Sequence, residues 1–325
     1  MGKSSTVVLD SSRFLVELCG VNDENLRLLE TLLGARIDSR GNELHIDSDD
    51  ETRHVLLRSV VDELRAHARM GQSPSGDLIR AVYESITDDD ETNPELLREN
   101  SIAIVGRDGT IFPRTIAQAH YARNLAQKEI VFSVGPAGTG KTYLAVAHAL
   151  SEVLGRKKRK LVLTRPVVEA GESLGYLPGD LAQKISPYLR PLYDAMESLV
   201  PFETIQRMEE QHVIEIAPLA YMRGRSLNNC YVILDEAQNT TREQMKMFLT
   251  RIGEGSRAVI TGDVTQIDLP RKQSSGLLHA IELLQGIPEI RFSFFTARDV
   301  VRNPLVQKII SAYESETAGK PEHGQ

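Results

Sequence analysis

Residues 135–142 read Gly135-Pro136-Ala137-Gly138-Thr139-Gly140-Lys141-Thr142, a complete match to the phosphate-loop pattern G-x-x-x-x-G-K-[ST]. An apolar run at 130–134 precedes this loop and a helical pattern at 143–154 follows it, which is the strand–loop–helix context that the motif requires. Glycines let backbone amides turn toward phosphate oxygens, and the helix N-terminus adds partial positive charge. We therefore expect a nucleoside triphosphate here, with Lys141 at its β- and γ-phosphates and the Thr142 hydroxyl on Mg²⁺.

Short apolar runs alternate with helical patterns from about residue 102 onward. Strand candidates that are separated by helices indicate a parallel sheet covered on both faces. We therefore predict an α/β fold for this part of the chain, with the phosphate loop at the end of its first strand. The runs cover residues 130–134, 160–164, 213–217, 231–234, 257–261 and 290–294.

Two carboxylates follow the apolar run 231–234. Beside the phosphate loop, Asp235 would hold Mg²⁺ through water, and Glu236 would polarise an attacking water molecule. A kinase acting on small molecules needs no water-activating glutamate at this place, whereas a nucleotide hydrolase does. The acid pair therefore favours hydrolysis over phosphotransfer.

A third strand candidate ends in Gly262-Asp263, and Gln266 lies three residues beyond the aspartate. The string G-D-x-x-Q stands at this place in superfamily-one helicases, where its glutamine senses the γ-phosphate and positions water. Because it follows the other two motifs in order, we expect Gln266 to take part in catalysis.

Gln118 lies 17 residues before the phosphate loop. A glutamine amide can pair with both an acceptor and a donor on an adenine edge. The sequence also lacks Asn-Lys-x-Asp, the usual guanine reader, so ATP is favoured over GTP. The alternative, a surface glutamine without a ligand, stays open.

The N-terminal region predicts a separate small α+β domain. Leucines at helical spacing over residues 26–33 are followed by alternating segments around Arg40-Gly41-Asn42, a plausible hairpin, and by a second helical pattern at 55–64. The predicted organisation is a domain at 1–70, a partly acidic linker at 71–101, the nucleotide-binding domain at 102–313 and a flexible tail at 314–325.

Charge is divided unevenly along the chain. Residues 1–106 hold 11 Lys and Arg against 21 Asp and Glu, whereas the remaining residues hold 27 against 24. Affinity for phosphate backbones comes mainly from basic side chains. We therefore expect any binding of nucleic acid to belong mainly to the second part of the chain.

Composition points to a cytoplasmic protein. No stretch approaches the roughly 18 apolar residues of a membrane helix, and no signal peptide is recognisable at the N-terminus. The two cysteines, Cys19 and Cys230, are too far apart for metal-ligand spacing. We expect a reducing compartment, no membrane partner and no zinc site.

Taken together, these motifs resemble the PhoH-like ATPases. The resemblance implies a RecA-like, helicase-related ATPase core behind a KH-like N-terminal domain. It also implies ATP and Mg²⁺ as cofactors and a role in RNA metabolism, with RNA, a YbeY-type endoribonuclease or ribosomal components as partners. The strings that carry it lie at residues 135–144, 164–172, 175–180, 217–225, 234–239, 261–270 and 301–306.

Two positions depart from the family pattern. Asn303 stands where the family has histidine in the string Val-Arg-His-Pro-Leu-Val, which puts any role of that histidine in doubt, although Arg302 is kept. The KH signature loop is G-x-x-G, but this chain has Gly20-Val21-Asn22-Asp23. An acidic residue in place of the second glycine weakens the case for RNA clamping, and favours protein docking by this domain.

Two functions are left open: an RNA-remodelling motor of helicase type, and an ATP-gated assembly factor that docks a nuclease or ribosomal partner without translocation. Too few residues follow Gln266 for a second RecA-like domain, so an activating arginine must come from a neighbouring subunit. We expect a homo-oligomer such as a hexameric ring, with Arg302 as the first candidate for that arginine and Arg225 as the second. Arg165 could face either RNA or a neighbour.

Overall fold

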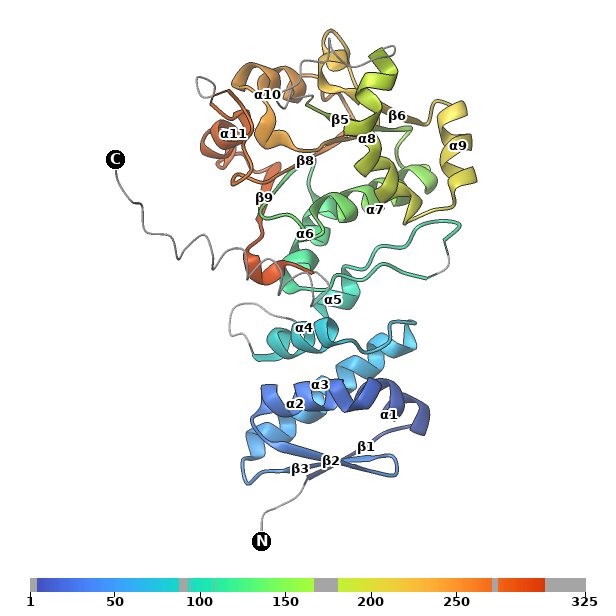
Figure 1. Cartoon of the computed structure of the whole chain (residues 1–325), viewed down its shortest axis with the longest axis vertical. Helices are drawn as coiled ribbons and strands as arrows, with labels where there is room; N and C mark the ends of the chain where they lie inside the picture. The colour runs from blue at the N-terminus through green and yellow to red at the C-terminus, as the bar shows by residue number, and fades with distance from the viewer. Residues whose placement is uncertain are drawn as a thin grey trace, which may run out of the picture.

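The computed structural model describes residues 5–87, 93, 95–107, 109–166, 181–270 and 274–301, with the backbone alone for 181–187. Two sheets organise this part of the chain. The first is a small three-stranded sheet near the N-terminus, and the second has six strands. Figure 1 shows them at opposite ends of the molecule, with helices α4 and α5 between them.

The N-terminal sheet is antiparallel, in the order β1-β3-β2. Its hairpin was predicted, whereas β1 was not, because four residues give too short an alternation. Helices α1, α2 and α3 pack on the sheet through leucine and valine side chains, which form one buried core. The bounds are β1 Ser5–Val8, α1 Ser12–Cys19, the 3₁₀ turn η1 Val21–Asp23, α2 Glu24–Leu33, β2 Arg36–Arg40, β3 Glu43–Asp47 and α3 Glu51–Arg69.

The segment expected as a linker contains two helices, α4 (Gly76–Thr87) and α5 (Leu96–Glu99). Their buried residues, among them Leu78, Val82 and Leu97, join the N-terminal core, as does Ala119 from the larger domain. The segment is therefore only partly a linker. The apolar residues of α4 are spaced so that one face of the helix is buried. The acidic run 88–91 lies outside the described residues, and the domain boundaries stay a prediction.

The second sheet has six parallel strands in the order β6-β5-β7-β8-β4-β9. All six predicted strands are confirmed, each within one residue at either end. This confirms an α/β fold with a parallel sheet. The bounds are β4 Ile130–Val134, β5 Lys160–Arg165, β6 Ile214–Pro218, β7 Cys230–Leu234, β8 Arg257–Gly262 and β9 Ile290–Phe294.

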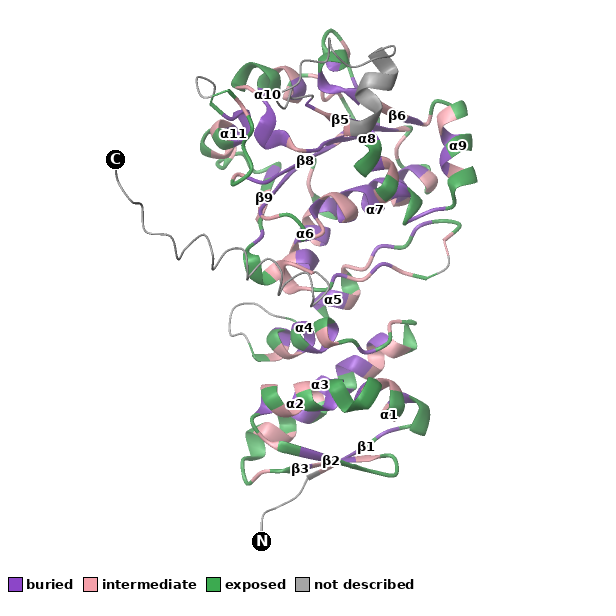
Figure 2. Ribbon diagram, in the orientation of Figure 1, coloured by how far each residue is buried: buried purple, intermediate pink, exposed green. Residues whose placement is uncertain are grey.

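Both faces of the large sheet are covered, and its inner strands are buried (Figure 2). Within β7, Tyr231 and Ile233 face one core cluster while Val232 and Leu234 face the other, as the pleat requires. The first cluster includes side chains of α6 (Ile116–Gln127), α7 (Lys141–Leu154), α8 (Leu181–Glu197) and α9 (Phe202–Glu210), and the second those of α10 (Arg242–Leu249) and α11 (Gly276–Leu284).

Strand order fixes where functional side chains can meet. The phosphate loop follows β4, and the acid pair follows β7, with β8 between these two strands. In a parallel sheet the carboxyl ends of the strands share one edge, where ligands bind in open α/β folds. Over the described residues, no helix is long and apolar enough to cross a membrane. Cys19 and Cys230 are both buried free thiols.

Candidate functional site

The carboxyl edge of β4, β7 and β8 encloses a cavity of about 280 Å³. The structure brings together there the five residues that were predicted to act through their side chains: Lys141, Thr142, Asp235, Glu236 and Gln266. They come from two strand ends, those of β7 and β8, and from the first turn of α7, so the fold makes neighbours of residues that are up to 125 positions apart in the sequence. The remaining lining residues are Ala137, Gly138, Gly140, Tyr143, Gly262 and Asp263.

The phosphate loop needs its glycines for conformation and for space. Gly135 has φ +153°, and a Cβ there would lie 2.5 Å from the carbonyl oxygen of Phe295. Gly140, directly before α7, has φ +81° in the left-handed region. The loop is therefore a backbone cradle that side chains at these positions would disrupt, as a phosphate site requires.

The Lys141 ammonium lies inside this cradle. Its Nζ donates to the carbonyl oxygens of Gly135 and Pro136, both at 2.6 Å, and lies 3.4 Å from the Thr139 hydroxyl. A bound triphosphate would offer this ammonium phosphate oxygens in place of neutral carbonyls, which is the stronger, charge-assisted interaction.

The Asp235 carboxylate accepts hydrogen bonds from two threonine hydroxyls. Its Oδ1 accepts from the Thr142 hydroxyl at 2.8 Å and from the Thr261 hydroxyl at 2.6 Å. Thr261, at the end of β8, was not predicted as a site residue. A carboxylate beside a phosphate-loop hydroxyl is a hard oxygen donor set that fits Mg²⁺.

Elsewhere in the described part of the chain, no group of three or more His, Cys, Asp or Glu side chains could hold a metal ion. Mg²⁺ commonly keeps several waters and binds through one or two protein groups together with substrate phosphates. The donor set at Thr142 and Asp235 suits that mode rather than an all-protein metal cage.

Glu236 has a left-handed backbone, with φ 53° and ψ 38°. Such a conformation costs a non-glycine residue on the order of 1–3 kcal/mol and is typical of functional sites. Its carboxylate lies 3.1 Å from the guanidinium of Arg165, at the end of β5, and also accepts from the Gln238 amide. Arg165, expected to face RNA or a neighbouring subunit, thus contacts the acid pair of its own chain.

Gln238 connects the two strand ends and was missed by the sequence reasoning. Only 1% exposed, it donates to Glu236 and to the carbonyl oxygen of Gln266, and accepts from the backbone N–H of Asp263 at 3.0 Å. The signal was present, since Gln238 stands two residues after Glu236 in the string that resembles the PhoH-like family.

The Gln266 amide donates to Asp263 Oδ2 at 2.6 Å, and Thr265 donates to Oδ1 through its amide at 2.9 Å and its hydroxyl at 2.7 Å. Burial raises the pKa of the Asp263 carboxyl, but these hydrogen bonds and the nearby Lys141 outweigh burial, so the pKa is lowered overall. Asp263 is therefore an anion that orients Gln266 at the rim of the cavity.

Gln118 is buried, and both ends of its amide contact backbone. Oε1 accepts from the Arg114 N–H at 2.8 Å, and Nε2 donates to the Thr139 carbonyl at 3.0 Å. The residue lies beside the phosphate loop, as predicted, but these contacts must break before the amide can read an adenine edge. That reading stays a prediction.

The two candidate activating arginines differ in what can be described. Arg302, like Asn303, lies outside the described residues. Arg225 forms a two-pronged contact with Glu215, at 2.5 and 2.9 Å. Hydrogen bonding from Arg225, assisted by Lys160 and opposed by burial, lowers the pKa of Glu215 to about 2. The guanidinium of Arg225 is thus engaged within its own chain.

Comparison with known proteins places the chain in a family. The family model described as PhoH-like protein matches residues 110–314. A PhoH-like protein of Mycobacterium tuberculosis (strain H37Rv) is 48% identical over 301 residues, which is 92% of this chain and 84% of the relative. One from Bacillus subtilis is 46% identical over 93% of this chain and 94% of its own length. Protein PhoH of Escherichia coli K12 is 43% identical over 62% of this chain and 58% of its own.

Proposed function

Because this chain belongs to the PhoH-like protein family, whose members carry a nucleotide-binding phosphate loop, we propose that it is a Mg²⁺-dependent ATP hydrolase with a RecA-like core. The observation that carries the proposal is the single cavity in which Lys141 and Thr142 meet Asp235, Glu236 and Gln266. The position of β8 between β4 and β7 supports the RecA-like assignment, because it adds a third strand end from which Gln266 can approach the γ-phosphate.

Hydrolysis needs a water oxygen to attack the γ-phosphorus while the bond to the β–γ bridging oxygen breaks, which gives ADP and phosphate. Lys141 binds the β- and γ-phosphate oxygens. Thr142 would hold Mg²⁺ directly and Asp235 would hold it through water, and the bound ion would neutralise part of the charge of the triphosphate. Glu236 accepts the proton of the attacking water, and Gln266 orients that water.

In this structure Glu236 is paired with Arg165 and Gln238. Gln238 and the guanidinium of Arg165 together hold the carboxylate in place. We propose that Arg165 turns toward the γ-phosphate when ATP binds, which leaves Glu236 to act on water. Such an exchange couples water activation to the presence of a triphosphate.

For the N-terminal domain we propose a KH-like fold. Its element order is β-α-α-β-β-α, and Gly20-Val21-Asn22-Asp23 lies in the turn between α1 and α2. KH domains clamp single-stranded nucleic acid with a G-x-x-G loop. Asp23 and the acidic charge of this region oppose that use, so we assign RNA contact mainly to the ATPase domain.

The leading functional proposal is RNA remodelling driven by ATP hydrolysis in the cytoplasm. The second candidate is an ATP-gated assembly factor for an endoribonuclease of the YbeY type or for ribosomal components. It is favoured by the acidic N-terminal region, which suits protein docking better than phosphate binding.

Phosphate release with and without single-stranded RNA separates the two candidates. A remodelling motor predicts that RNA raises ATP turnover several-fold, and that Lys141→Ala abolishes both basal and stimulated rates. Turnover that RNA leaves unchanged, together with ATP-dependent capture of a YbeY-type endoribonuclease or of ribosomes, would favour the assembly factor. Absence of any Mg²⁺-dependent ATP hydrolysis would contradict both.

A further inference from the structure

A second cavity, of about 230 Å³, adjoins the phosphate loop. It shares Gly138, Gly140 and Tyr143 with the cavity that holds the acid pair, so the two form adjacent parts of one recess around the loop. Its remaining lining residues come from the segment before α6, from α6 and α7 themselves, and from the segment after β9. They are Phe112, Arg114, Gln118, Leu144 and Val301.

The chemistry of these walls fits a flat heterocycle. A nucleotide with its phosphates at Lys141 must place its base in space that is continuous with the loop. Phe112, Tyr143 and Val301 offer aromatic and aliphatic surface there, and pockets for small ligands are built mainly from such side chains. Stacking on an aromatic ring is worth about 1–3 kcal/mol per base and is tolerant of base identity.

Hydrogen bonds also join the walls of the recess to the phosphate loop. The Val301 N–H donates to the Gly138 carbonyl at 3.0 Å, so the segment after β9 is attached to the phosphate loop itself. Gln118 joins the opposite wall to the same loop through Arg114 and Thr139. In this structure Gln118 therefore supports the recess, and the aromatic rings offer surface for stacking beside it.

The Phe112 wall rests on the N-terminal domain. Its ring meets that of His67, on α3, edge to face with centroids 5.7 Å apart. Directly before Phe112, Ile111 pairs with Ile102 through two backbone hydrogen bonds of 2.8 and 2.9 Å. The position of the ring is therefore set by this pairing and by His67.

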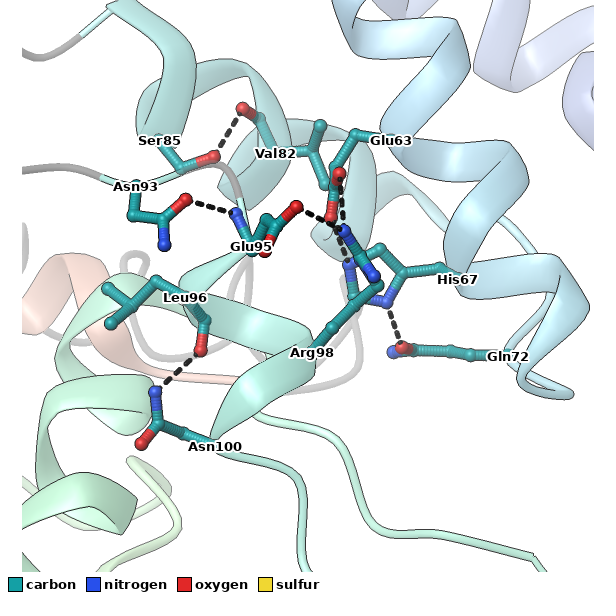
Figure 3. Close-up of polar contacts among 10 residues, drawn as sticks. All are labelled: Glu63, His67, Gln72, Val82, Ser85, Asn93, Glu95, Leu96, Arg98 and Asn100. Carbon is teal, nitrogen blue, oxygen red and sulfur yellow. Dashed lines mark hydrogen bonds and ion pairs between the residues drawn. The ribbon is translucent and has the colours of Figure 1, made fainter.

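Polar groups lie near both ring nitrogens of His67 (Figure 3), although only Nδ1 has a hydrogen-bond partner. The ring is fully buried, its Nδ1 lies 2.7 Å from Gln72 Oε1, and its Nε2 lies 3.5 Å from a carboxylate oxygen of Glu63. Arg98 on α5 holds that carboxylate with two contacts, at 2.6 and 3.2 Å. A buried polar cluster thus sets the ring of His67 against the wall of the recess.

The recess is where the adenine expected beside Gln118 would lie, and we propose that His67 of the N-terminal domain is the positioning residue for the Phe112 wall of this nucleobase pocket. The inference rests on the proposed function. It concerns the part of the site that binds the base, whereas the phosphate motifs concern only the part that binds the phosphates. Nucleotide affinity then depends on the N-terminal domain, so a partner that shifts α3 changes nucleotide affinity, and by reciprocity nucleotide binding changes the affinity for that partner.

The test compares a ligand with a base and one without, on the full-length protein. Calorimetry measures the Kd of Mg²⁺-ADP and of Mg²⁺-tripolyphosphate for each variant. Phe112→Ala should weaken ADP about tenfold while tripolyphosphate stays within about twofold of wild type, because only the stacking contact is lost. Phe112→Leu, which keeps more apolar surface, should fall between, and the exposed Phe202→Ala should bind both ligands as wild type does.

His67 needs its own pair of variants. His67→Ala should weaken ADP about threefold and tripolyphosphate hardly at all, and His67→Phe should restore ADP affinity because it returns a ring against Phe112. His54→Ala, on the same helix, is the matched control.

Three results would overturn the proposal, each in a different way. Equal weakening of both ligands by Phe112→Ala would show a folding effect and not a base pocket. Unchanged ADP affinity in His67→Ala would remove the N-terminal domain from the site. Wild-type protein that binds neither ligand would instead contradict the proposed ATPase function itself.

Discussion

Gln238 lies where the strand ends that carry Glu236 and Asp263 meet. Its amide contacts Glu236, the Asp263 backbone and the Gln266 carbonyl, so a single side chain orients the groups expected to act on water. Buried polar side chains of this kind are costly to remove because their partners lose hydrogen bonds without access to solvent.

We predict that Gln238→Leu lowers kcat about 10–100-fold while KM for ATP changes little, because the phosphate loop is untouched and only the water-orienting groups are released. Steady-state phosphate release measures both constants. Gln127→Leu, an exposed glutamine at the end of α6, is the control and should match wild type. A Gln238→Leu protein whose main defect is in KM would show that Gln238 supports substrate binding instead.

Individual site residues could be predicted from the sequence wherever a motif assigns a chemical role to a residue type. Lys141, Thr142, Asp235, Glu236 and Gln266 were predicted in this way, and they line one cavity, although their catalytic roles are untested. Thr261, Arg165 and Gln238 were not assigned to it. Their roles depend on which strands are neighbours, and strand order cannot be read from spacing along the chain.

Among the elements, α7 and β7 meet at a buried polar contact. His148 on α7 lies 2.9 Å from the Tyr231 hydroxyl, with Glu152, Lys157 and Arg257 nearby. Burial lowers the pKa of His148 from its ordinary value to about 4, which the positive charges of Arg257 and Lys157 reinforce and Glu152 opposes. His148 is therefore neutral in the folded protein at neutral pH.

This contact predicts a loss of stability in acid. Between about pH 6.5 and pH 4 the unfolded chain binds a proton at His148 that the folded protein does not, so the free energy of unfolding falls as pH falls through this window. The contribution is about 2 kcal/mol at pH 5. Urea unfolding of wild type and His148→Phe at neutral pH and at pH 5 should show a smaller acid loss in the variant. Equal losses would contradict the assignment.

The elements that could be predicted are those with a strong apolar signal. All six strands of the large sheet were recognisable because a strand buried on both faces reads as a continuous apolar run. The four-residue β1 has no such run, and α4 was read as part of a linker because the residues around it are polar and acidic. α4 belongs to the core because it packs on α2 and α3, and this surface exists only in the folded chain.

For the whole molecule, the question is whether one chain completes the active site. An arginine that reaches the γ-phosphate raises rates of phosphoryl transfer by about 10³–10⁵. Arg225, the second candidate, is engaged by Glu215, which leaves Arg302 as the main candidate in a neighbouring subunit.

We therefore predict that Lys141→Ala and Arg302→Ala proteins, each inactive alone, recover ATPase activity when mixed. In rings formed at random from an equimolar mixture, roughly a quarter of the interfaces would pair an intact Lys141 site with an intact Arg302. We therefore expect about a quarter of the wild-type ATPase activity. The measurement is phosphate release against the mixing ratio. A mixture as inactive as its components, or full wild-type activity from a strict monomer at all dilutions, would contradict the model.

On the proposed mechanism, the acid pair beside the phosphate loop hydrolyses ATP, with Glu236 acting on water. The most direct measurement is phosphate release at saturating Mg²⁺-ATP, made beside ATP binding, for wild type, Glu236→Gln and Lys141→Ala. We predict that Glu236→Gln binds ATP as wild type does but turns it over about 10²–10⁴-fold more slowly, whereas Lys141→Ala loses binding itself. Turnover by Glu236→Gln within about threefold of wild type would contradict the mechanism, because the loss of a proton acceptor cannot leave the rate unchanged.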